Sequence, residues 1–554
     1  MRVPKLWRTI GALGVGALVA TACPGPAGPE PTPDGSGSEP VQAGDYDWSD
    51  PNLRRAISMA IDRQSITDVI FQGARAPADD FWPSIIGGYR GAGSCPNLEY
   101  NPEEALTLFE ESGGDKGTLR LWFNSGAGHE DWVEAVSNQL QENLLIEDIE
   151  FEALEFAPYL DALDQGQVDG PFRLGWLMDY PSAENFLRPL HGTGGSSNHT
   201  GYSNPDFDAL VAQGDAAGIE DGIPFYQDAA DILCADMPIA PMFFGLLQGV
   251  HSANVANVEF DAFQALEVEQ VEDVAGDGIT MYICEPQTAL FGQNSNETCG
   301  SEVVRGLFTG LVTLGDDGQT LEYDAVAESI TSEDDTTWTI TLKPDWTFHD
   351  GTAVDAASFL RAWNWAALAP NGAANNFFFS SIDGYEAMNP PDANEDGTPD
   401  SEPTATELTG LTLVDDLTFT VTLSTAFPLF PLQLLYNAFN PLPAAFADPA
   451  TFGDAPIGNG PFMFPEGGAW EHNVQVALVR YDGYGGTAPS AASITYKIYS
   501  ADTTGYNDVR SGALDIMDTV PIAEIEAAKT EFGERYFEEP TASFNYLGFP
   551  IDPQ

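Results

Sequence analysis

The chain has 554 residues and carries 85 acidic against 20 basic side chains, a formal net charge of −65. This length exceeds the usual size of one domain, so we expect two or three lobes. Nucleic acid is excluded as a partner, because phosphate binding requires clustered lysines and arginines. The excess of carboxylates would also suit the capture of cations, but we interpret it as a solvated acidic surface of the kind found in salt-adapted proteins.

The first residues are typical of an export signal. Basic residues precede an apolar run over 9–22 that is too short to span a bilayer. Residues 1–23 resemble a lipoprotein signal peptide, in which Cys23 is diacylated and becomes the mature N-terminus; a plain secretory signal with a free Cys23 is the alternative. Residues 24–47 are rich in Pro, Gly and Ser and predict an extended tether. We therefore expect an exported protein whose only contact with the membrane is a lipid anchor at the outer face of the cytoplasmic membrane.

Helices and strands are predicted in alternation along the rest of the chain. The first helix has Asp50 as a candidate N-cap and Pro51 at its first position, followed by an apolar stripe of Leu53, Ala56, Ile57, Ala60 and Ile61. The predicted helices cover 51–72, 102–113, 129–145, 205–217 and 222–236. The predicted strands cover 118–125, 279–285, 337–348, 417–423, 474–481 and 494–500. The pattern indicates an α/β protein without solenoid repeats.

Four cysteines follow the predicted signal. In an exported protein an even number predicts two disulfides, for which three pairings are possible. Cys284 and Cys299 bracket a short loop and are the favoured pair, which leaves Cys95 with Cys234. None of them has CxxC spacing, so we expect no zinc or redox site.

The motifs of common enzymes are absent from the sequence: GxSxG, HExxH, the P-loop and GxGxxG. We therefore expect neither an enzyme nor a cofactor. An acidic, proline-rich insertion at 388–407 lacks the spacing of an EF-hand, and we expect no metal there. Aromatic residues instead concentrate around lone acids in loops at 172–187 and 375–385, a pattern that favours recognition of a ligand.

Several stretches together resemble family 5 solute-binding proteins, the oligopeptide and dipeptide receptors of ABC importers. TWTITLKPDWTFHDG (337–351) and APIGNGPF (455–462) resemble the opening half of the family. LRRAISMAIDR (53–63) and GYSNPDFDALV (201–211) resemble its closing half, and ICEPQ (283–287) is most similar to actinobacterial members. The resemblance covers nearly all of the chain from residue 48.

The two halves stand in an order opposite to that of the family. Residues 48–272 resemble the later half, yet they precede residues 273–554. We interpret this order as a circular permutation; a rearranged or misassembled gene is the alternative. Permutation is tolerated when the native termini lie close together, so residues 545–554 should lie beside residues 48–56.

The resemblance implies an α/β, two-lobed, periplasmic-binding-protein-like fold (class C, type II) with a third accessory domain, here circularly permuted. Transferred by motif, residues 48–240 form the second ligand-binding lobe. Residues 241–318 with 432–554 form the first lobe, and residues 319–431 form the accessory domain.

The resemblance also implies that a monomer binds a peptide between its lobes and delivers it to ABC permease subunits. The family's anchor for the peptide amino group matches Asp179 in GWLMDYP (175–181). A carboxylate removed from water requires a cation, which the α-ammonium supplies; a capping or turn role is the alternative. Trp176 is expected to wall the cleft or to lie in the core. The other expected cleft residues are Glu285, Gln287, Phe378, Asn545 and Tyr546.

Two further functions are compatible with the resemblance. One is a receptor of the same fold for another solute, such as a nickel complex, an oligosaccharide or haem, against which Asp179 argues. The other is a signalling or wall-interaction lipoprotein that feeds no permease.

Overall fold

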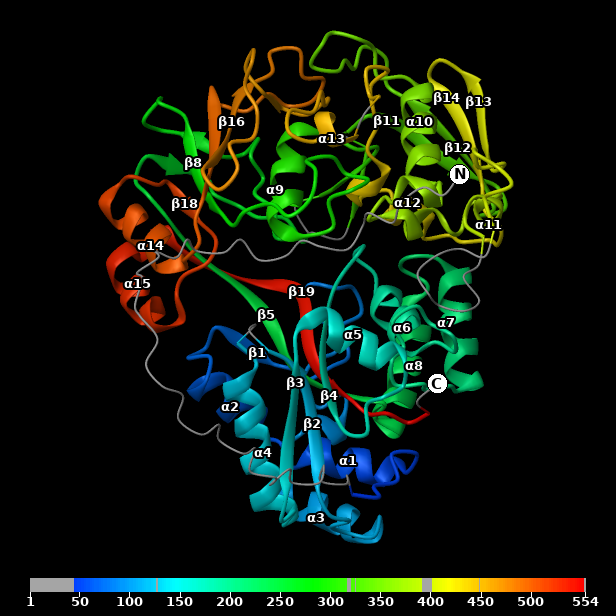
Figure 1. The fold of residues 1–554 in the computed structure, drawn as a ribbon, viewed down its shortest axis with the longest axis vertical. Helices are drawn as coiled ribbons and strands as arrows, with labels where there is room; N and C mark the ends of the chain where they lie inside the picture. Colours follow the sequence, from blue (N-terminus) through cyan, green and yellow to red (C-terminus); the bar gives the residue numbers. More distant parts are fainter. Residues whose placement is uncertain are drawn as a thin grey trace, which may run out of the picture. The chain divides into compact units, whose positions relative to one another are not determined.

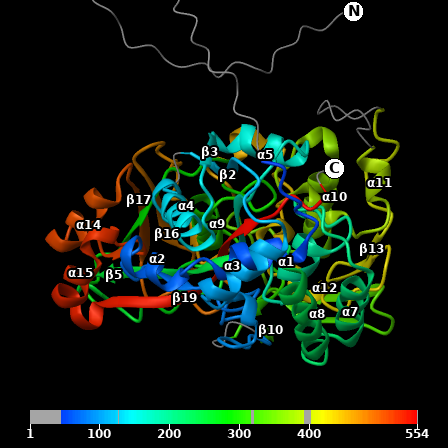
Figure 2. The ribbon, with the colours of Figure 1, turned by 90° about the horizontal axis from the view of Figure 1, so that it is seen from below.

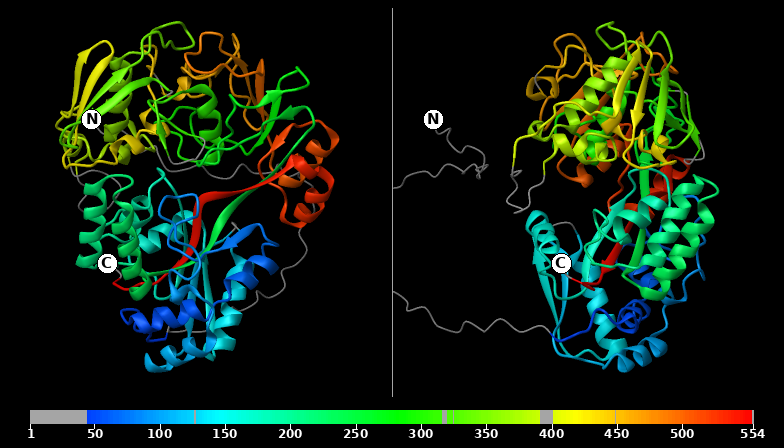
Figure 3. Two further views of the ribbon diagram at one scale, coloured as in Figure 1. Left: turned by 180° about the vertical axis from the view of Figure 1, so that it is seen from behind. Right: turned by 90° about the vertical axis from the view of Figure 1, so that its right-hand side faces the viewer.

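Two antiparallel strands, β5 (Ile239–His251) and β19 (Tyr536–Gly548), run side by side between two lobes in the computed structural model (Figures 1 and 2). The structure describes residues 44–125, 128–315, 320–323, 325–390, 401–447 and 449–552. These residues belong to a single unit, Ala43–Gln554. The chain passes along β5 out of residues 44–238, here called lobe A, into residues 252–535, here called lobe B, and returns along β19. Figure 3 shows the two strands between the lobes from behind and from the side.

Lobe A is an α/β layer in which β2 pairs in parallel with β3 and β4. Its strands are β1 (Arg75–Pro77), β2 (Leu119–Asn124), β3 (Ile149–Leu154) and β4 (Phe172–Leu177). Its helices are α1 (Pro51–Met59), α2 (Arg63–Val69), α3 (Pro102–Glu111), α4 (Glu130–Leu144), α5 (Phe156–Asp164), α6 (Glu184–His191), α7 (Pro205–Ala217) and α8 (Ile223–Asp236).

Lobe B contains the other end of the main sheet and a separate smaller sheet. The main-sheet strands are β8 (Ile279–Ile283), β15 (Phe462–Met463), β16 (Gln475–Arg480), β17 (Ser493–Ile498) and β18 (Ile516–Met517). Their helices are α9 (Thr298–Leu307), α13 (Pro449–Phe452), α14 (Asp502–Ser511) and α15 (Ile525–Phe532). Lobe B also contains two separate pairs of short strands: β6 (Val255–Ala256) with β7 (Glu272–Asp273), and β9 (Thr313–Leu314) with β10 (Leu321–Glu322).

The smaller sheet has the order β11-β12-β14-β13 and is antiparallel throughout. Its strands are β11 (Ala327–Ser332), β12 (Thr337–Leu342), β13 (Leu411–Asp415) and β14 (Thr418–Thr422), with helices α10 (Ala356–Ala367), α11 (Tyr385–Met388) and α12 (Phe430–Gln433) nearby in the chain. This sheet lies within the range predicted for the accessory domain. Its buried side chains belong to the same hydrophobic cluster as those of lobe B.

The main sheet joins both lobes in the order β15-β16-β17-β8-β18-β5-β19-β4-β2-β3, with β1 paired to β5. On its side away from β19, β5 pairs with β18 of lobe B and with β1 of lobe A, whereas β19 pairs on its other side with β4 of lobe A. The expected two-lobed α/β fold is confirmed. No helix among the described residues is long and apolar enough to cross a bilayer.

The apolar stripe near the start of the described chain is buried as predicted. Asp50 accepts a hydrogen bond from the Asn52 amide at 2.9 Å and caps α1, with Pro51 at its first position. Leu53 is 3% exposed and the other four stripe residues are fully buried. The prediction of one helix over 51–72 is wrong, because the Asp62 side chain accepts a hydrogen bond from the Ser65 amide and starts a second helix, α2.

Most other predicted elements are confirmed with small differences in their ends. The largest difference is the strand predicted over 337–348, which ends at Leu342 as β12. Pro344 has no amide proton for a strand ladder, and Asp345 takes a φ of 72°, so the chain turns there.

The two ends of the described chain meet in lobe A, as the permuted order predicts. The Trp48 ring stacks on Phe549 with ring centroids 5.7 Å apart. The Phe549 amide donates to the Pro238 carbonyl at 3.2 Å, and the Ile551 amide donates to the Thr200 carbonyl at 2.9 Å. The expected proximity of residues 545–554 and 48–56 is therefore confirmed.

Replacing Phe549 tests whether this tail holds the end of β19 in place. Phe549 is fully buried, so Phe549→Ala should lower the free energy of unfolding by about 3–5 kcal/mol. Denaturant unfolding measures the change. The control is Asp552→Ala, at an exposed position further along the same tail. Its free energy of unfolding should stay within about 0.5 kcal/mol of that of the unchanged protein. Equal effects of the two substitutions would contradict a tail held by Phe549.

Candidate functional site

A cavity of about 480 Å³ is lined by residues of both lobes and of β5. Lobe A contributes Leu177 and Met178 from the end of β4, and β5 contributes Leu247. Lobe B contributes Phe263, Gln264, Ala265, Tyr282, Ile283, Cys284, Asn296, Glu297, Thr298, Cys299, Ser301, Glu302, Arg305, Tyr436, Asn437, Asp502, Asp518 and Thr519. A partly apolar cavity with a few polar groups between two lobes is where a small ligand is expected to bind.

Asp179 follows the two lobe A residues that line this cavity. Its amide donates to Asn185 Oδ1 at 2.8 Å, and Asn185 Nδ2 donates to Asp179 Oδ2 at 3.2 Å. Burial raises the pKa of Asp179 to about 6, and the hydrogen bond from Asn185 opposes part of that rise. Asp179 forms no ion pair with any described residue, so its carboxylate is available to a cation from outside the protein.

Trp176 belongs to the same hydrogen-bonded group. Its indole Nε1 donates to Asn185 Oδ1 at 3.2 Å, and its side chain is partly exposed. Asn185 therefore joins Trp176 and Asp179 at the first turn of α6. Asn185 was not predicted from the sequence, although it lies in the same aromatic-rich stretch as Asp179.

An ionic network, in which Glu184 is buried and Arg188 is exposed, holds the loop behind Asp179. Tyr180 donates its hydroxyl proton to Glu184 Oε2 at 2.5 Å, and Arg188 Nε lies 3.0 Å from Glu184 Oε1. Arg188 also pairs with Asp215, which accepts a hydrogen bond from the Tyr226 hydroxyl at 2.9 Å. Burial raises the pKa of Glu184, while Arg188 opposes the rise. The network fixes α6 and thereby the position of Asn185.

The same loop touches lobe B directly. Tyr180 packs in a small apolar cluster with Leu429 and Leu432, which lie at and within α12. Asp179 is therefore next to a contact between the lobes. A ligand bound at Asp179 would face both of them.

Phe378 does not line the cavity but packs against Tyr436, which does. It is 7% exposed and its ring stacks on Tyr436 at a centroid distance of 4.1 Å. Tyr436 lines the cavity; burial raises the pKa of its hydroxyl, and the nearby carboxylate of Asp179 raises that pKa further. Tyr436 was not selected from the sequence, because nothing local links it to Asp179, 257 residues earlier in the chain.

Glu285 and Gln287 lie in the loop that a disulfide closes beside the cavity, but neither lines the cavity. Glu285 accepts hydrogen bonds from His472 Nδ1 at 3.1 Å and from the Asn473 amide at 2.8 Å. The Gln287 side chain is exposed, and its amide donates to Glu297 Oε1 at 3.2 Å.

Asn545 and Tyr546 lie on β19 away from the cavity lining. Asn545 Oδ1 accepts a hydrogen bond from Arg173 Nε at 3.1 Å, and Arg173 also donates to Asn124 Oδ1 at 3.0 Å. Tyr546 is 3% exposed and packs beside Phe544, with centroids 5.3 Å apart. Asn545 therefore binds Arg173 of the neighbouring strand, Tyr546 is part of the core, and neither residue lines the cavity.

Both predicted disulfides are confirmed. Cys284 and Cys299 have Cα atoms 5.7 Å apart, and both residues line the cavity. Cys95 and Cys234 have Cα atoms 5.6 Å apart and link α8 to the segment before α3. Cys23, the predicted lipid attachment site, lies outside the described residues.

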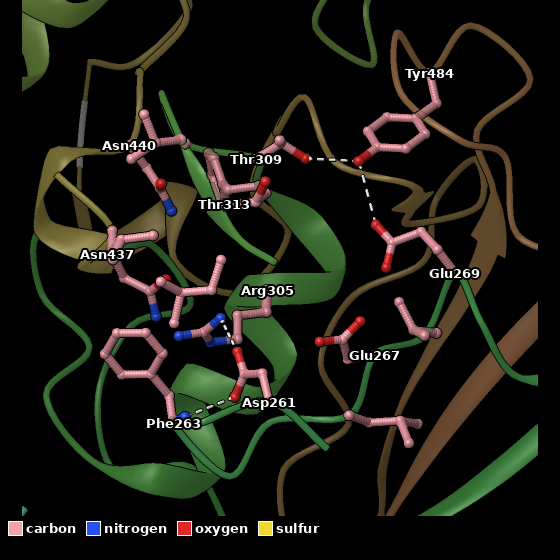
Figure 4. A pocket seen from close by; sticks show the side chains of 17 residues that line it. Asp261, Phe263, Glu267, Glu269, Arg305, Thr309, Thr313, Asn437, Asn440 and Tyr484 are labelled. Carbon is pink, nitrogen blue, oxygen red and sulfur yellow. Dashed lines mark hydrogen bonds and ion pairs between the residues drawn. The ribbon is translucent and has the colours of Figure 1, made fainter. Parts of the chain in front are cut away.

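A second, smaller cavity of about 170 Å³ shares Phe263, Arg305 and Asn437 with the first (Figure 4). Arg305 Nη1 lies 2.6 Å from Asp261 Oδ2, and its guanidinium lies 4.6 Å from the centroid of the Phe263 ring. Tyr484 donates to Glu269 Oε1 at 3.2 Å, and burial raises the pKa of Glu269. The wall shared by the two cavities thus carries a guanidinium that is already paired.

The described residues contain no group of three or more His, Cys, Asp or Glu side chains that could hold a metal ion. The acidic insertion at 388–407 is described only in part, and Asp392, Asn394, Asp396 and Asp400 lie outside the described residues.

Comparison with known proteins identifies one family. The family model described as "Bacterial extracellular solute-binding proteins, family 5 Middle" matches residues 42–198 and 323–553. The oligopeptide-binding protein OppA of Bacillus subtilis is 28% identical over 217 residues, which cover 37% of this chain and 39% of the relative. The periplasmic murein peptide-binding protein MppA of Escherichia coli is 30% identical over 206 residues, which cover 35% of this chain and 37% of the relative.

These matches span less than half the length of the curated relatives. Among solved structures, Haemophilus influenzae OppA in complex with the peptide RPPGFSPFR has a TM-score of 0.39 and 24% identity, covering 46% of this chain and 48% of that chain.

The raised pKa of Asp179 predicts a pH-dependent effect on stability. The pKa of an unfolded aspartate is about 3.9, so the stability that the protonated carboxyl contributes is complete below about pH 4 and is lost as the pH rises through about 6. Asp179→Asn removes this loss of stability, because the amide that replaces the carboxyl group does not ionise. It should raise the free energy of unfolding by roughly 1–3 kcal/mol at pH 8 and change it little at pH 4.

Urea unfolding at both pH values measures the difference. The control is Glu466→Gln, which neutralises an exposed carboxylate outside the cavities. It should change the free energy of unfolding by the same small amount at pH 4 and at pH 8. An equal gain from Asp179→Asn at pH 4 and pH 8 would contradict a pKa raised by burial.

Proposed function

The chain belongs to the family 5 bacterial extracellular solute-binding proteins, and we propose that it binds peptides with a free amino terminus in the cavity between its lobes. In this proposal the protein acts outside the cytoplasm and delivers the peptide to the permease subunits of an ABC importer. Its family consists of solute-binding proteins and not of enzymes.

The observation that carries the proposal is the unpaired carboxylate of Asp179. Asn185 fixes its position, burial disfavours its charge, and it has no cationic partner among the described residues. The α-ammonium group of a peptide is a cation that can both pair with the carboxylate and donate several hydrogen bonds. A site of this kind selects for a free amino terminus without reading side chains.

The size and composition of the cavity also support a peptide. A volume of about 480 Å³ lies within the usual range for small-ligand sites. No histidine lines it, so no imidazole in that lining would coordinate a haem iron or a nickel ion. The names of the relatives, oligopeptide-binding and murein peptide-binding protein, agree with a peptide ligand.

Calorimetry with short peptides tests the amino-terminal anchor. Alanine peptides of two to five residues with free termini should bind, and their N-acetylated forms should not. Asp179→Ala should weaken the best peptide by about 3–5 kcal/mol, because it leaves the buried ammonium without its partner, which is about two to three orders of magnitude in Kd.

Glu466→Gln should leave that affinity unchanged. Equal binding of free and acetylated peptides, or no effect of Asp179→Ala, would remove Asp179 from the site. Mass spectrometry of ligands that purify with the protein distinguishes a peptide from an oligosaccharide, a nickel complex or haem.

We also propose that the protein works as a monomer anchored through a diacylated Cys23. The support is the sequence of residues 1–23 followed by the Pro- and Gly-rich residues 24–47. In a bacterial host, Cys23→Ser should abolish incorporation of labelled palmitate and release the protein from the membrane fraction. Ser36→Ala, in the predicted tether, should do neither. Labelling that survives Cys23→Ser would contradict the anchor.

A further inference from the structure

The cavity contains more carboxylates than an amino-terminal anchor needs. Four acidic side chains line it, and Arg305 is the one basic residue in the lining: the acids are Glu297, Glu302, Asp502 and Asp518. A solvated acidic surface accounts for carboxylates that point into water. It does not account for carboxylates that line a cavity between two lobes.

Two of the four acids have partners that explain their positions. Glu297 caps α9 by accepting hydrogen bonds from the Cys299 amide at 2.9 Å and the Gly300 amide at 2.8 Å. Asp502 accepts a hydrogen bond from the Tyr282 hydroxyl at 2.6 Å. These contacts are structural, and they leave Glu302 and Asp518 to be explained.

Glu302 and Asp518 form no ion pair with a described residue, although the nearby Arg305 opposes part of the rise that burial causes in the pKa of Glu302. Glu302 is 7% exposed and accepts one hydrogen bond, from the Leu266 amide to Oε2 at 3.1 Å. Asp518 directly follows β18 and is partly exposed in the cavity wall. Burial raises the pKa of Glu302 to about 8 and that of Asp518 to about 6. A carboxylate without a cation is costly in such a place, and an entering cation would offset that cost.

Arg305 does not fill this role, because Asp261 pairs with it at 2.6 Å. Its guanidinium also lies over the Phe263 ring, 4.6 Å from the centroid. The wall therefore already binds one guanidinium between a carboxylate and an aromatic ring. Tyr282 and Tyr436 add two more rings to the same cavity, and aromatic faces attract ammonium and guanidinium groups.

We propose that Asp518 and Glu302 form a side-chain subsite that selects a lysine or arginine of the bound peptide. The inference rests on the proposed function and names the class of peptide that the protein prefers. Leu177 and Met178 line the same cavity and immediately precede Asp179. Asp179 itself is not part of the lining, so the anchor for the amino terminus lies next to the cavity whose wall carries the subsite for the cationic side chain.

Peptides that differ in a single side-chain charge test the subsite. Alanine peptides of the length that binds best are compared with lysine, or its uncharged isostere norleucine, placed at each position in turn. At one position or more, lysine should bind about tenfold to a hundredfold more tightly than norleucine, as expected for a charge-assisted contact.

The protein's charge of −65 attracts any cationic peptide, so the comparison is repeated at 1 M salt, where the Debye length is about 3 Å. The variants Asp518→Asn and Glu302→Gln keep side-chain shape and should reduce the lysine preference at least severalfold while leaving norleucine peptides nearly unchanged. Glu466→Gln removes one exposed charge outside the cavity and should keep the full preference. The unfolding midpoint of each variant verifies that it is folded.

Equal affinities for lysine and norleucine at every position, or a preference that survives in both Asp518→Asn and Glu302→Gln, would overturn the subsite while leaving the peptide-binding proposal intact. If one variant does not fold, the other variant decides the outcome, together with the ratio of lysine to norleucine affinities in the unchanged protein. If no peptide binds at all, the proposed function fails and the subsite fails with it.

Discussion

The pairing of β5 with β19 is the interaction on which the rest of the structure depends. Between residues 44 and 552 the chain passes from one lobe to the other only along these two strands. Their ladder runs from Tyr536 to Pro540 and resumes at Phe544, with one register shift between these two parts and a second between Asn545 and Tyr546. Such an irregularity bends a strand without dissolving the pairing on either side of it.

The first register shift lies just before β19 begins, at Ser543, to pair also with β4 of lobe A. Gly245 of β5 faces this point, and a Cβ atom there would approach the Ser543 hydroxyl to 2.2 Å and the Thr541 hydroxyl to 2.3 Å. The two strands are therefore in close contact at the position where a change of lobe orientation would have to be absorbed. Only a residue without a side chain fits there.

The acidic residues of this protein fall into groups with different physical roles. Glu184 and Asp215 share Arg188 inside lobe A, and Asp515 accepts hydrogen bonds from Ser252, Asn254 and Thr280. These carboxylates are neutralised or fully hydrogen-bonded, so they hold structure together. Asp179, Glu302 and Asp518 form no ion pair with a described residue, although Arg305 lies near Glu302, which separates them from the structural acids and from the solvated surface. A cationic ligand that paired with these carboxylates would offset the cost of burying them without a partner.

The features that depend on neighbouring residues could be predicted from the sequence alone. The stripe from Leu53 to Ile61, the cap at Asp50 and the short Cys284–Cys299 loop are local patterns, and the family was recognisable from its motifs. Asp179 was selected from its motif as well. The break before α2 was missed even though its signal, the capping Asp62, is local.

Which residues line the cavity depends on the folded structure. Tyr436, Glu302 and Asp518 line it although they belong to distant parts of the chain, and Asp179 lies close to Tyr436 beside the lining. Glu285 instead bonds to His472, 187 residues away, and Tyr546 enters the core. Periodicity and capping act within a few residues, whereas a cavity between two lobes is set by long-range packing across β5 and β19. No local pattern encodes that packing, and for this reason the acids of the proposed cation subsite became visible only in the folded molecule.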